Sequence, residues 1–268
     1  MVKWLLILNV GIYLLDLLIE WRIDYKWMRE FGAFTMQSAF KEGRIWQFVT
    51  FQFLHADFLH LLMNSLGIYF FGPWMEQWWG ATKFWIFYLL CGVGGAVFFS
   101  LLVSLGLLPA DDMQTPLVGA SAGIYGILIG VAVIAPNLRV RLFFPPIELS
   151  MRQLALGLMA LSTVMILMKM GGNEGGEAGH LGGALCGFLL MRYPRLLGSG
   201  SGEIRIFQPK AAKPQPQPKI RPRSGLEKAQ DTEVDLILDK ISSHGFQSLT
   251  QAEKDLLQKV SNQKQAQR

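Results

Sequence analysis

The chain has 268 residues, of which 51% are hydrophobic and only 17% are charged. Soluble globular proteins carry about 25% charged residues, so this composition excludes a disordered chain and argues against a soluble enzyme. Two cysteines exclude a disulfide scaffold. The formal net charge of +5 lies mostly in residues 198–268, which hold 12 Lys/Arg and 8 Asp/Glu and do not resemble a nucleic-acid-binding patch. The favoured class is a multi-pass membrane protein.

Six apolar segments follow one another along the chain. They cover residues 4–19, 58–72, 84–108, 117–136, 153–170 and 178–193. A helix needs about 20 apolar residues to cross a bilayer, so the first, second and sixth segments are short. No small-residue cleavage site follows the first segment, which favours a retained span over a signal peptide. We therefore expect an all-α, polytopic membrane protein with six transmembrane helices.

The orientation of these helices follows from the basic residues in the short loops. Most of these residues face the inner side if the N-terminus lies in the cytoplasm. The exception is the first loop, about 20–52, which carries five Lys/Arg and many aromatic residues. We interpret this loop as a structured segment at the membrane interface. Both termini are then predicted to be cytoplasmic, in a bacterial inner membrane.

A soluble tail is expected after the six segments. Residues 1–195 form the predicted membrane domain, residues 196–230 a Gly-, Pro- and Gln-rich linker, and residues 231–262 a small helical hairpin. Gly245 can end the first tail helix, and Thr250 with Glu253 forms a capping box that can begin the second. So small a hairpin is not expected to fold stably without a partner, and the sequence does not identify that partner.

Polar side chains inside apolar spans are costly and therefore informative. The second segment contains His60 and Asn64, the fourth contains Ser121, and the sixth contains His180. Even-numbered spans all start on the same side of the membrane. Because His60, Ser121 and His180 each lie within about five residues of a span's start, they are expected within about 10 Å of one surface.

The chemistry suited to this set is acyl transfer. A serine hydroxyl needs a base to remove its proton, and His180 is the candidate base for Ser121. The Asn64 amide, a His60 ring N–H and the Ser121 backbone N–H could bind the oxyanion of a tetrahedral intermediate. No acidic residue stands out to orient the base, so the sequence favours a Ser–His dyad over a triad.

Glycines support the same arrangement. Gly119 with Gly123, Gly126 with Gly130, and the series Gly179, Gly183 and Gly187 are spaced by four residues. Such faces allow two helix backbones to approach closely. A short serine side chain could then reach a histidine on another helix.

Each polar residue taken alone favours simple helix packing, and only their shared depth argues for a site. A metal site is disfavoured because His55 and His60 do not form a His-Glu-x-x-His motif. Haem ligation by two histidines is also disfavoured, and a transporter would place its polar groups nearer mid-membrane. No metal or cofactor is expected. Asp57 is predicted to cap the second span, and Glu76 to make a structural bond.

These motifs resemble the rhomboid family of intramembrane serine proteases, over about residues 1–195. His60-Leu-Leu-Met-Asn64 is similar to the family's His-x3-Asn, and Gly119-Ala-Ser121-Ala-Gly-Ile-Tyr125 to its Gly-x-Ser motif with the following tyrosine. Gly179-His180-Leu-Gly-Gly183 resembles the histidine motif of its last span. Gln47 follows Trp46 where the family has Trp-Arg, so no arginine role is carried over.

The resemblance implies Ser121 as nucleophile, His180 as base, and His60 and Asn64 as oxyanion donors, with Tyr125 packed on the His180 ring and Gly119 in support. It also implies that the protein cleaves membrane proteins in or beside a transmembrane segment, near helix-breaking and small residues. The alternative function is a catalytically silent rhomboid-like protein that binds transmembrane partners.

Overall fold

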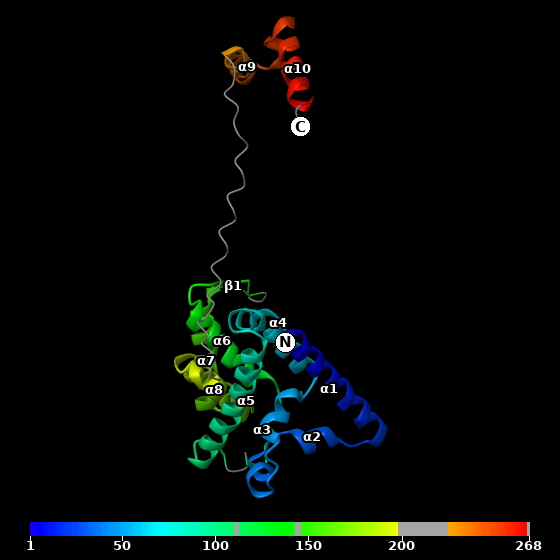
Figure 1. The fold of residues 1–268 in the computed structure, drawn as a ribbon, viewed down its shortest axis with the longest axis vertical. Helices are drawn as coiled ribbons and strands as arrows, with labels where there is room; N and C mark the ends of the chain where they lie inside the picture. Colours follow the sequence, from blue (N-terminus) through cyan, green and yellow to red (C-terminus); the bar gives the residue numbers. More distant parts are fainter. Residues whose placement is uncertain (110–112, 143–145, 198–224, 267–268) are drawn as a thin grey trace. The chain divides into compact units, whose positions relative to one another are not determined.

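The structure is a computed structural model that describes residues 1–109, 113–142, 146–197 and 225–266. The chain divides into two units, Met1–Phe207 and Gln208–Arg268 (Figure 1). Helices dominate both units, which confirms the predicted all-α class. Most of the predicted linker, 198–224, lies outside the described residues.

The first unit contains a helix for every predicted span. These helices are α1 (Val2–Ile23), α4 (Phe58–Trp79), α5 (Ala81–Ser104), α6 (Ser121–Ile134), α7 (Met151–Met168) and α8 (Glu174–Arg192). Two short α-helices and two other short helices lie between α1 and α4: α2 (Trp27–Gly32), η1 (Gln37–Lys41), α3 (Gln47–Thr50) and η2 (Phe51–Phe53). The 3₁₀ helix η4 (Pro194–Leu197) follows α8.

Local sequence explains where several helices begin and end. The Asp57 carboxylate accepts the His60 backbone N–H at 2.9 Å, which confirms the predicted N-cap of α4. That helix continues past Pro73 until Gly80, whose φ of +80° ends it. Ser150 and Gln153 form a complete capping box at the start of α7.

A short antiparallel hairpin connects α6 to α7 and was not predicted from the sequence. Its strands are β1 (Arg139–Arg141) and β2 (Glu148–Ser150), with Val140 opposite Leu149. Three-residue strands provide too little alternation to distinguish them from a loop by pattern alone.

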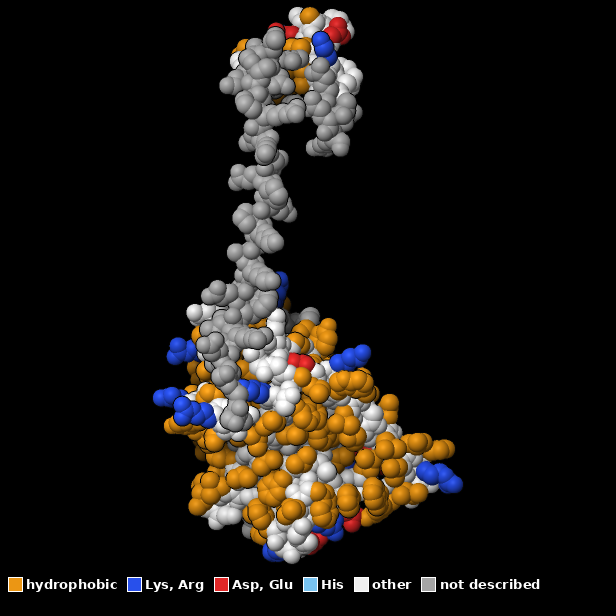
Figure 2. Space-filling model, in the orientation of Figure 1, with side chains coloured by type: hydrophobic (Ala, Val, Ile, Leu, Met, Phe, Trp, Pro, Cys, Tyr) orange, Lys and Arg blue, Asp and Glu red, His pale blue; other side chains and the backbone are white. Residues whose placement is uncertain are grey.

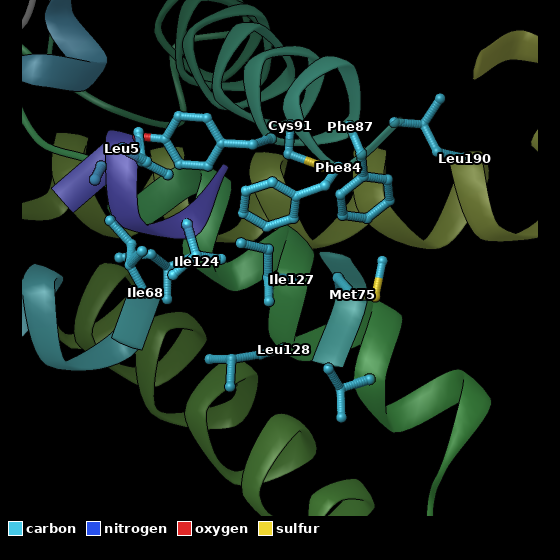
Figure 3. Packing of buried hydrophobic residues seen from close by; sticks show 14 of the residues in the cluster. Leu5, Ile68, Met75, Phe84, Phe87, Cys91, Ile124, Ile127, Leu128 and Leu190 are labelled. Carbon is cyan, nitrogen blue, oxygen red and sulfur yellow. The ribbon is translucent and has the colours of Figure 1, made fainter. Parts of the chain in front are cut away.

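Helix α6 is the centre of the first unit, because it packs against α4, α5, α7 and α8. Figure 3 shows Ile124, Ile127 and Leu128 of α6 among apolar side chains of the surrounding helices. At a rise of about 1.5 Å per residue, its 14 residues extend about 21 Å, less than the hydrocarbon core of about 30 Å. The neighbouring helices therefore enclose a helix that is too short to span the membrane by itself.

Helices α6 and α8 approach so closely at two positions of α8 that no side chain fits there. A Cβ on Gly183 would lie 2.0 Å from the Ala122 carbonyl oxygen, and one on Gly187 would lie 2.7 Å from the Gly126 Cα. Such distances are far inside van der Waals contact, so only glycine fits at these two positions. Of the α8 series predicted from the sequence, these contacts confirm Gly183 and Gly187, whereas a Cβ on Gly179 meets nothing within 4 Å.

The outer helices carry the surface suited to lipid. By length and composition, three of the described helices can cross a membrane: α1, α5 and α7. Many of their large hydrophobic side chains are exposed, including Leu14 and Leu18 of α1 and Leu167 of α7. Figure 2 shows hydrophobic side chains over much of this face, with charged side chains mainly at its margins. A surface this apolar indicates an integral membrane protein.

The segment between α1 and α4 is structured, as predicted. Fully buried Gln47 accepts a hydrogen bond from Ser38 and donates one of 3.2 Å to the Phe31 carbonyl. The Trp46 ring N–H donates to the same carbonyl at 3.0 Å. In this chain Gln47 thus helps to fix the loop through hydrogen bonds.

Glu76 connects α4 to α1 at the end of α4 that is predicted to face the cytoplasm. The Glu76 carboxylate accepts the Val2 backbone N–H at 2.8 Å and pairs with the amino group of Met1. This contact agrees with the structural bond predicted for Glu76.

The second unit contains α9 (Gly225–His244), the 3₁₀ helix η5 (Phe246–Ser248) and α10 (Gln251–Ala266). Gly245 follows α9 with a φ of +80°, and Thr250 and Glu253 form the predicted capping box. Lys240 of α9 pairs with Glu253 of α10 at 2.8 Å. The Lys240 ammonium, together with the Thr250 N–H and hydroxyl, lowers the pKa of Glu253 to about 2.

We predict that Gly183→Ala destabilises the protein, because its Cβ would collide with backbone that cannot move aside. The expected loss of unfolding free energy is about 1–3 kcal/mol. Gly179→Ala is the matched control, because a Cβ there meets nothing within 4 Å. Thermal unfolding in detergent measures both variants. Equal midpoints for the two would contradict the close packing of α6 and α8.

A second prediction concerns the boundary of the membrane unit. Leu197 is buried in its main core, so a chain cut after Pro194 loses a core side chain, whereas a chain cut after Phe207 keeps it. Removing a buried leucine costs about 2–5 kcal/mol. The longer truncated chain should therefore unfold at the full-length midpoint, and the shorter one well below it. Equal midpoints for the two truncated chains would show that Leu197 contributes nothing.

Candidate active site

The start of α6 places Ser121 in a helix N-terminus. The first intrahelical hydrogen bond runs from the Ile124 N–H to the Ala120 carbonyl, so the Ser121 N–H belongs to the first turn. First-turn N–H groups have no acceptor within their own helix, and the helix dipole makes this end favourable for negative charge. The Ser121 backbone can therefore donate to an oxyanion.

The predicted span 117–136 becomes helical only at Ser121, because the preceding segment is extended and held by the first loop. Leu117 exchanges both backbone hydrogen bonds with Phe34, at 2.8 and 3.1 Å, and the Gly119 N–H donates to the Phe51 carbonyl at 2.9 Å. Non-helical backbone is tolerated within a membrane protein only where protein or water satisfies it. These bonds satisfy that requirement.

Gly119 lies directly beside two side chains of α4. Its φ is +117°, a conformation that favours glycine, and a Cβ there would lie 2.6 Å from His60 Nε2 and 3.3 Å from Asn64 Nδ2. The glycine therefore brings the segment before Ser121 against the predicted oxyanion donors. His60 and Asn64 are thus brought beside Gly119, two residues before Ser121.

The hydrogen bonds of His60 determine which ring nitrogen can donate. The Ala56 backbone N–H donates to His60 Nδ1 at 3.4 Å, so the neutral ring carries its proton on Nε2. That nitrogen is the one nearest Gly119. His55 is buried and packs edge-on against the His60 ring, with 5.2 Å between ring centroids. The His60 Nε2–H is thereby directed at the candidate site.

Asn64 is buried with its amide nitrogen unused. Nδ2 has no hydrogen-bond partner among the described residues, and the residue is 5% exposed. A buried donor without an acceptor costs about 1–3 kcal/mol. A group retained at that cost beside Gly119 is a candidate for binding a transient acceptor.

His180 reaches the site from α8. Its ring stacks on Tyr125 of α6, with centroids 4.3 Å apart and planes 10° from parallel. Tyr125 lies one helical turn after Ser121 on the same helix. The described structure contains no hydrogen bond between the Ser121 hydroxyl and the His180 ring. Catalytic hydrogen bonds often tighten only when substrate is bound.

Two residues at the site were not identified from the sequence. The Glu177 carboxylate contacts His180 Nδ1 at 3.1 Å, and the fully buried Ser162 of α7 lies 3.4 Å from the Tyr125 hydroxyl. Glu177 falls one residue before the predicted sixth span, although its i, i+3 spacing from His180 would have placed both on one helix face. Ser162 is a polar residue inside an apolar helix, a signal equal to that of Asn64.

Comparison with known proteins identifies the family of the membrane unit. The rhomboid domain family matches residues 42–195, more than half of the chain. The chain belongs to the rhomboid family. Residues 226–263, which include most of α9 and α10, match a second family whose function is unknown, DUF6576.

Individual relatives are distant. RHOMBOID-like protein 12, mitochondrial, of Arabidopsis thaliana is 26% identical over 190 residues, which cover 67% of this chain and 54% of that protein. Rhomboid-like protein 11, chloroplastic, of the same plant is 32% identical over 46% of this chain and 38% of its own length. Rhomboid-like protease 3 of Toxoplasma gondii is 25% identical over 72% of this chain and 68% of its own length. The chain thus spans about half or less of the two plant relatives.

We predict that Asn64→Ala lowers kcat about 10²- to 10³-fold, the usual effect of removing one oxyanion donor, with little change in KM. Its unfolding midpoint should not fall, because the lost amide nitrogen has no partner in the described structure. Ser65→Ala, which removes the neighbouring unpartnered hydroxyl, is the control and should keep full activity. Asn64→Ala with wild-type kcat would exclude the amide from the reaction.

Proposed function

We propose that this rhomboid family member is an intramembrane serine endopeptidase that hydrolyses peptide bonds in or beside transmembrane segments of other membrane proteins. The observation that carries the proposal is the position of two side-chain donors beside Gly119, two residues before Ser121. They are the His60 Nε2–H and the Asn64 amide, and the Ser121 backbone N–H lies in the first turn of the helix that follows. Packing alone gives no reason for several donors to gather around one backbone position.

In the proposed reaction, the Ser121 hydroxyl attacks the scissile carbonyl carbon while His180 accepts the hydroxyl proton. The carbonyl oxygen becomes an oxyanion, which the three donors stabilise. The intermediate collapses as His180 returns the proton to the leaving amine, and the C–N bond breaks to leave an ester on Ser121. Water, activated by His180, then hydrolyses that ester and frees the serine.

The substrate is proposed to be a membrane-protein segment that is already partly unwound. The carbonyls of a regular helix are engaged in hydrogen bonds and are not available to a nucleophile. Segments with helix-breaking and small residues expose a carbonyl at lower cost. The Toxoplasma relative is named a protease, which supports this class of activity for the shared domain.

The proposed location is a bacterial inner membrane, with both termini in the cytoplasm and the site near the opposite surface. The distribution of basic residues in the short loops supports this orientation. Binding of transmembrane partners without cleavage is the competing function, and the experiment below distinguishes the two.

The decisive experiment uses the full-length protein in liposomes with a model transmembrane substrate. Ser121→Ala and His180→Ala should each lower cleavage about 10³-fold or more, because each removes a group that acts as part of a unit. Both should also lose labelling by a fluorophosphonate probe. Ser104→Ala and His244→Ala are matched controls outside the site and should behave as wild type. Equal cleavage by wild type and Ser121→Ala would overturn the proposal, and binding without cleavage would favour the silent alternative.

A further inference from the structure

The candidate base is in contact with a carboxylate that no sequence motif assigns. The Glu177 Oε2 atom lies 3.1 Å from His180 Nδ1, and the Glu177 and His180 side chains are 11% and 17% exposed. Glu177 precedes His180 by three residues on α8, so both project from one face of the helix. The contact is therefore local to α8 and largely shielded from solvent.

The chemistry of the contact determines the tautomer of the ring. An ionised carboxylate can only accept hydrogen bonds, so the Nδ1 atom of His180 must carry the proton that it donates. In a neutral imidazole the other nitrogen, Nε2, then holds the free electron pair. Glu177 thus leaves Nε2 as the atom able to remove a proton from Ser121.

A second restraint acts on the plane of the same ring. Tyr125 stacks face to face with His180, which limits tilting, whereas the bond to Glu177 limits rotation of the ring in its own plane. Stacking alone would allow the two ring nitrogens to exchange places by a flip. The Glu177 carboxylate prevents this flip, because it binds only the Nδ1 side of the ring.

Ser162 of α7 supports the second of these restraints. Its hydroxyl lies 3.4 Å from the Tyr125 hydroxyl, so a polar contact with α7 holds the ring that stacks on His180. Residues from α6, α7 and α8 thereby contribute to the position of one imidazole.

The position of Glu177 makes an ionised carboxylate acceptable there. It lies in the first turn of α8, where the helix dipole favours negative charge. A buried polar group is tolerated when it is hydrogen-bonded, and the contact with His180 Nδ1 supplies such a partner. Proton transfer from Ser121 would create an imidazolium, which the adjacent carboxylate would stabilise.

We propose that Glu177 is the positioning residue of His180: it selects the tautomer with a free Nε2 and stabilises the imidazolium formed during acyl transfer. The proposal rests on the proposed function and extends the predicted Ser–His dyad to a Ser–His–Glu arrangement. A purely structural ion pair at the start of α8 is the competing interpretation. It would affect stability but not the catalytic step.

The test compares Glu177→Gln, Glu177→Asp and Glu174→Gln in the full-length protein. Glu177→Gln removes the charge with little change in shape. Glu177→Asp keeps the charge on a shorter side chain, and Glu174→Gln removes another charge from the same helix turn. Each variant is measured for kcat and KM on the model substrate, for the rate of fluorophosphonate labelling, and for its unfolding midpoint. Ser162→Ala, which removes the hydroxyl beside Tyr125, provides a variant that keeps the carboxylate.

We expect Glu177→Gln to lower kcat and the labelling rate about 10- to 100-fold with KM within about twofold, an effect in the range of general acid–base catalysis. Glu177→Asp should recover most of kcat, Ser162→Ala should lose a smaller part, and Glu174→Gln should match wild type. A Glu177→Gln variant with wild-type kcat, or one whose loss Glu177→Asp does not relieve, would overturn this proposal while leaving the protease intact. A wild type that neither labels nor cleaves would overturn the proposed function and this extension with it.

Discussion

The arrangement of the candidate site depends on the close contact between α6 and α8 at Gly183 and Gly187, where no side chain fits. Helices in a bilayer gain little from hydrophobic association, because lipid tails are as apolar as leucine. Their contact must therefore come from close packing. Gly183 lies against the carbonyl of Ala122, the residue that follows Ser121. His180 lies about one helical turn before Gly183 on α8. The distance between the two helices thus sets the distance between the candidate nucleophile and base.

The same packing separates two kinds of helix. The outer helices α1, α5 and α7 are long and apolar, whereas α4 and α8 carry the polar residues of the site and α6 is short. Packing against neighbouring helices allows α4 and α8 to contain groups that would be expensive against lipid. The Asn64 amide is the clearest case. Its buried nitrogen lowers stability, and no hydrogen bond within the described residues compensates for that loss.

Much of this arrangement could be predicted from the sequence because two simple patterns determine it. Long apolar segments locate the helices, and the parity of the spans places His60, Ser121 and His180 in one layer. Glu177 was missed for a physical reason: it lies at a helix start, where acidic residues are common and therefore uninformative. The late start of α6 could not be predicted either, because the positive φ of Gly119 and its bond to Phe51 are tertiary features.

The backbone bridge between Phe34 and Leu117 also has a consequence for the order of assembly. It joins the loop after the first span to the residues just before Ser121, so the start of α6 is fixed by a segment made much earlier. Contacts between distant parts of a chain form late, since loop closure must precede them. His180 is contributed by the last span of the bundle. A partly inserted chain would therefore possess Ser121 without an organised oxyanion site or base, and hydrolytic competence would arise only when the bundle closes.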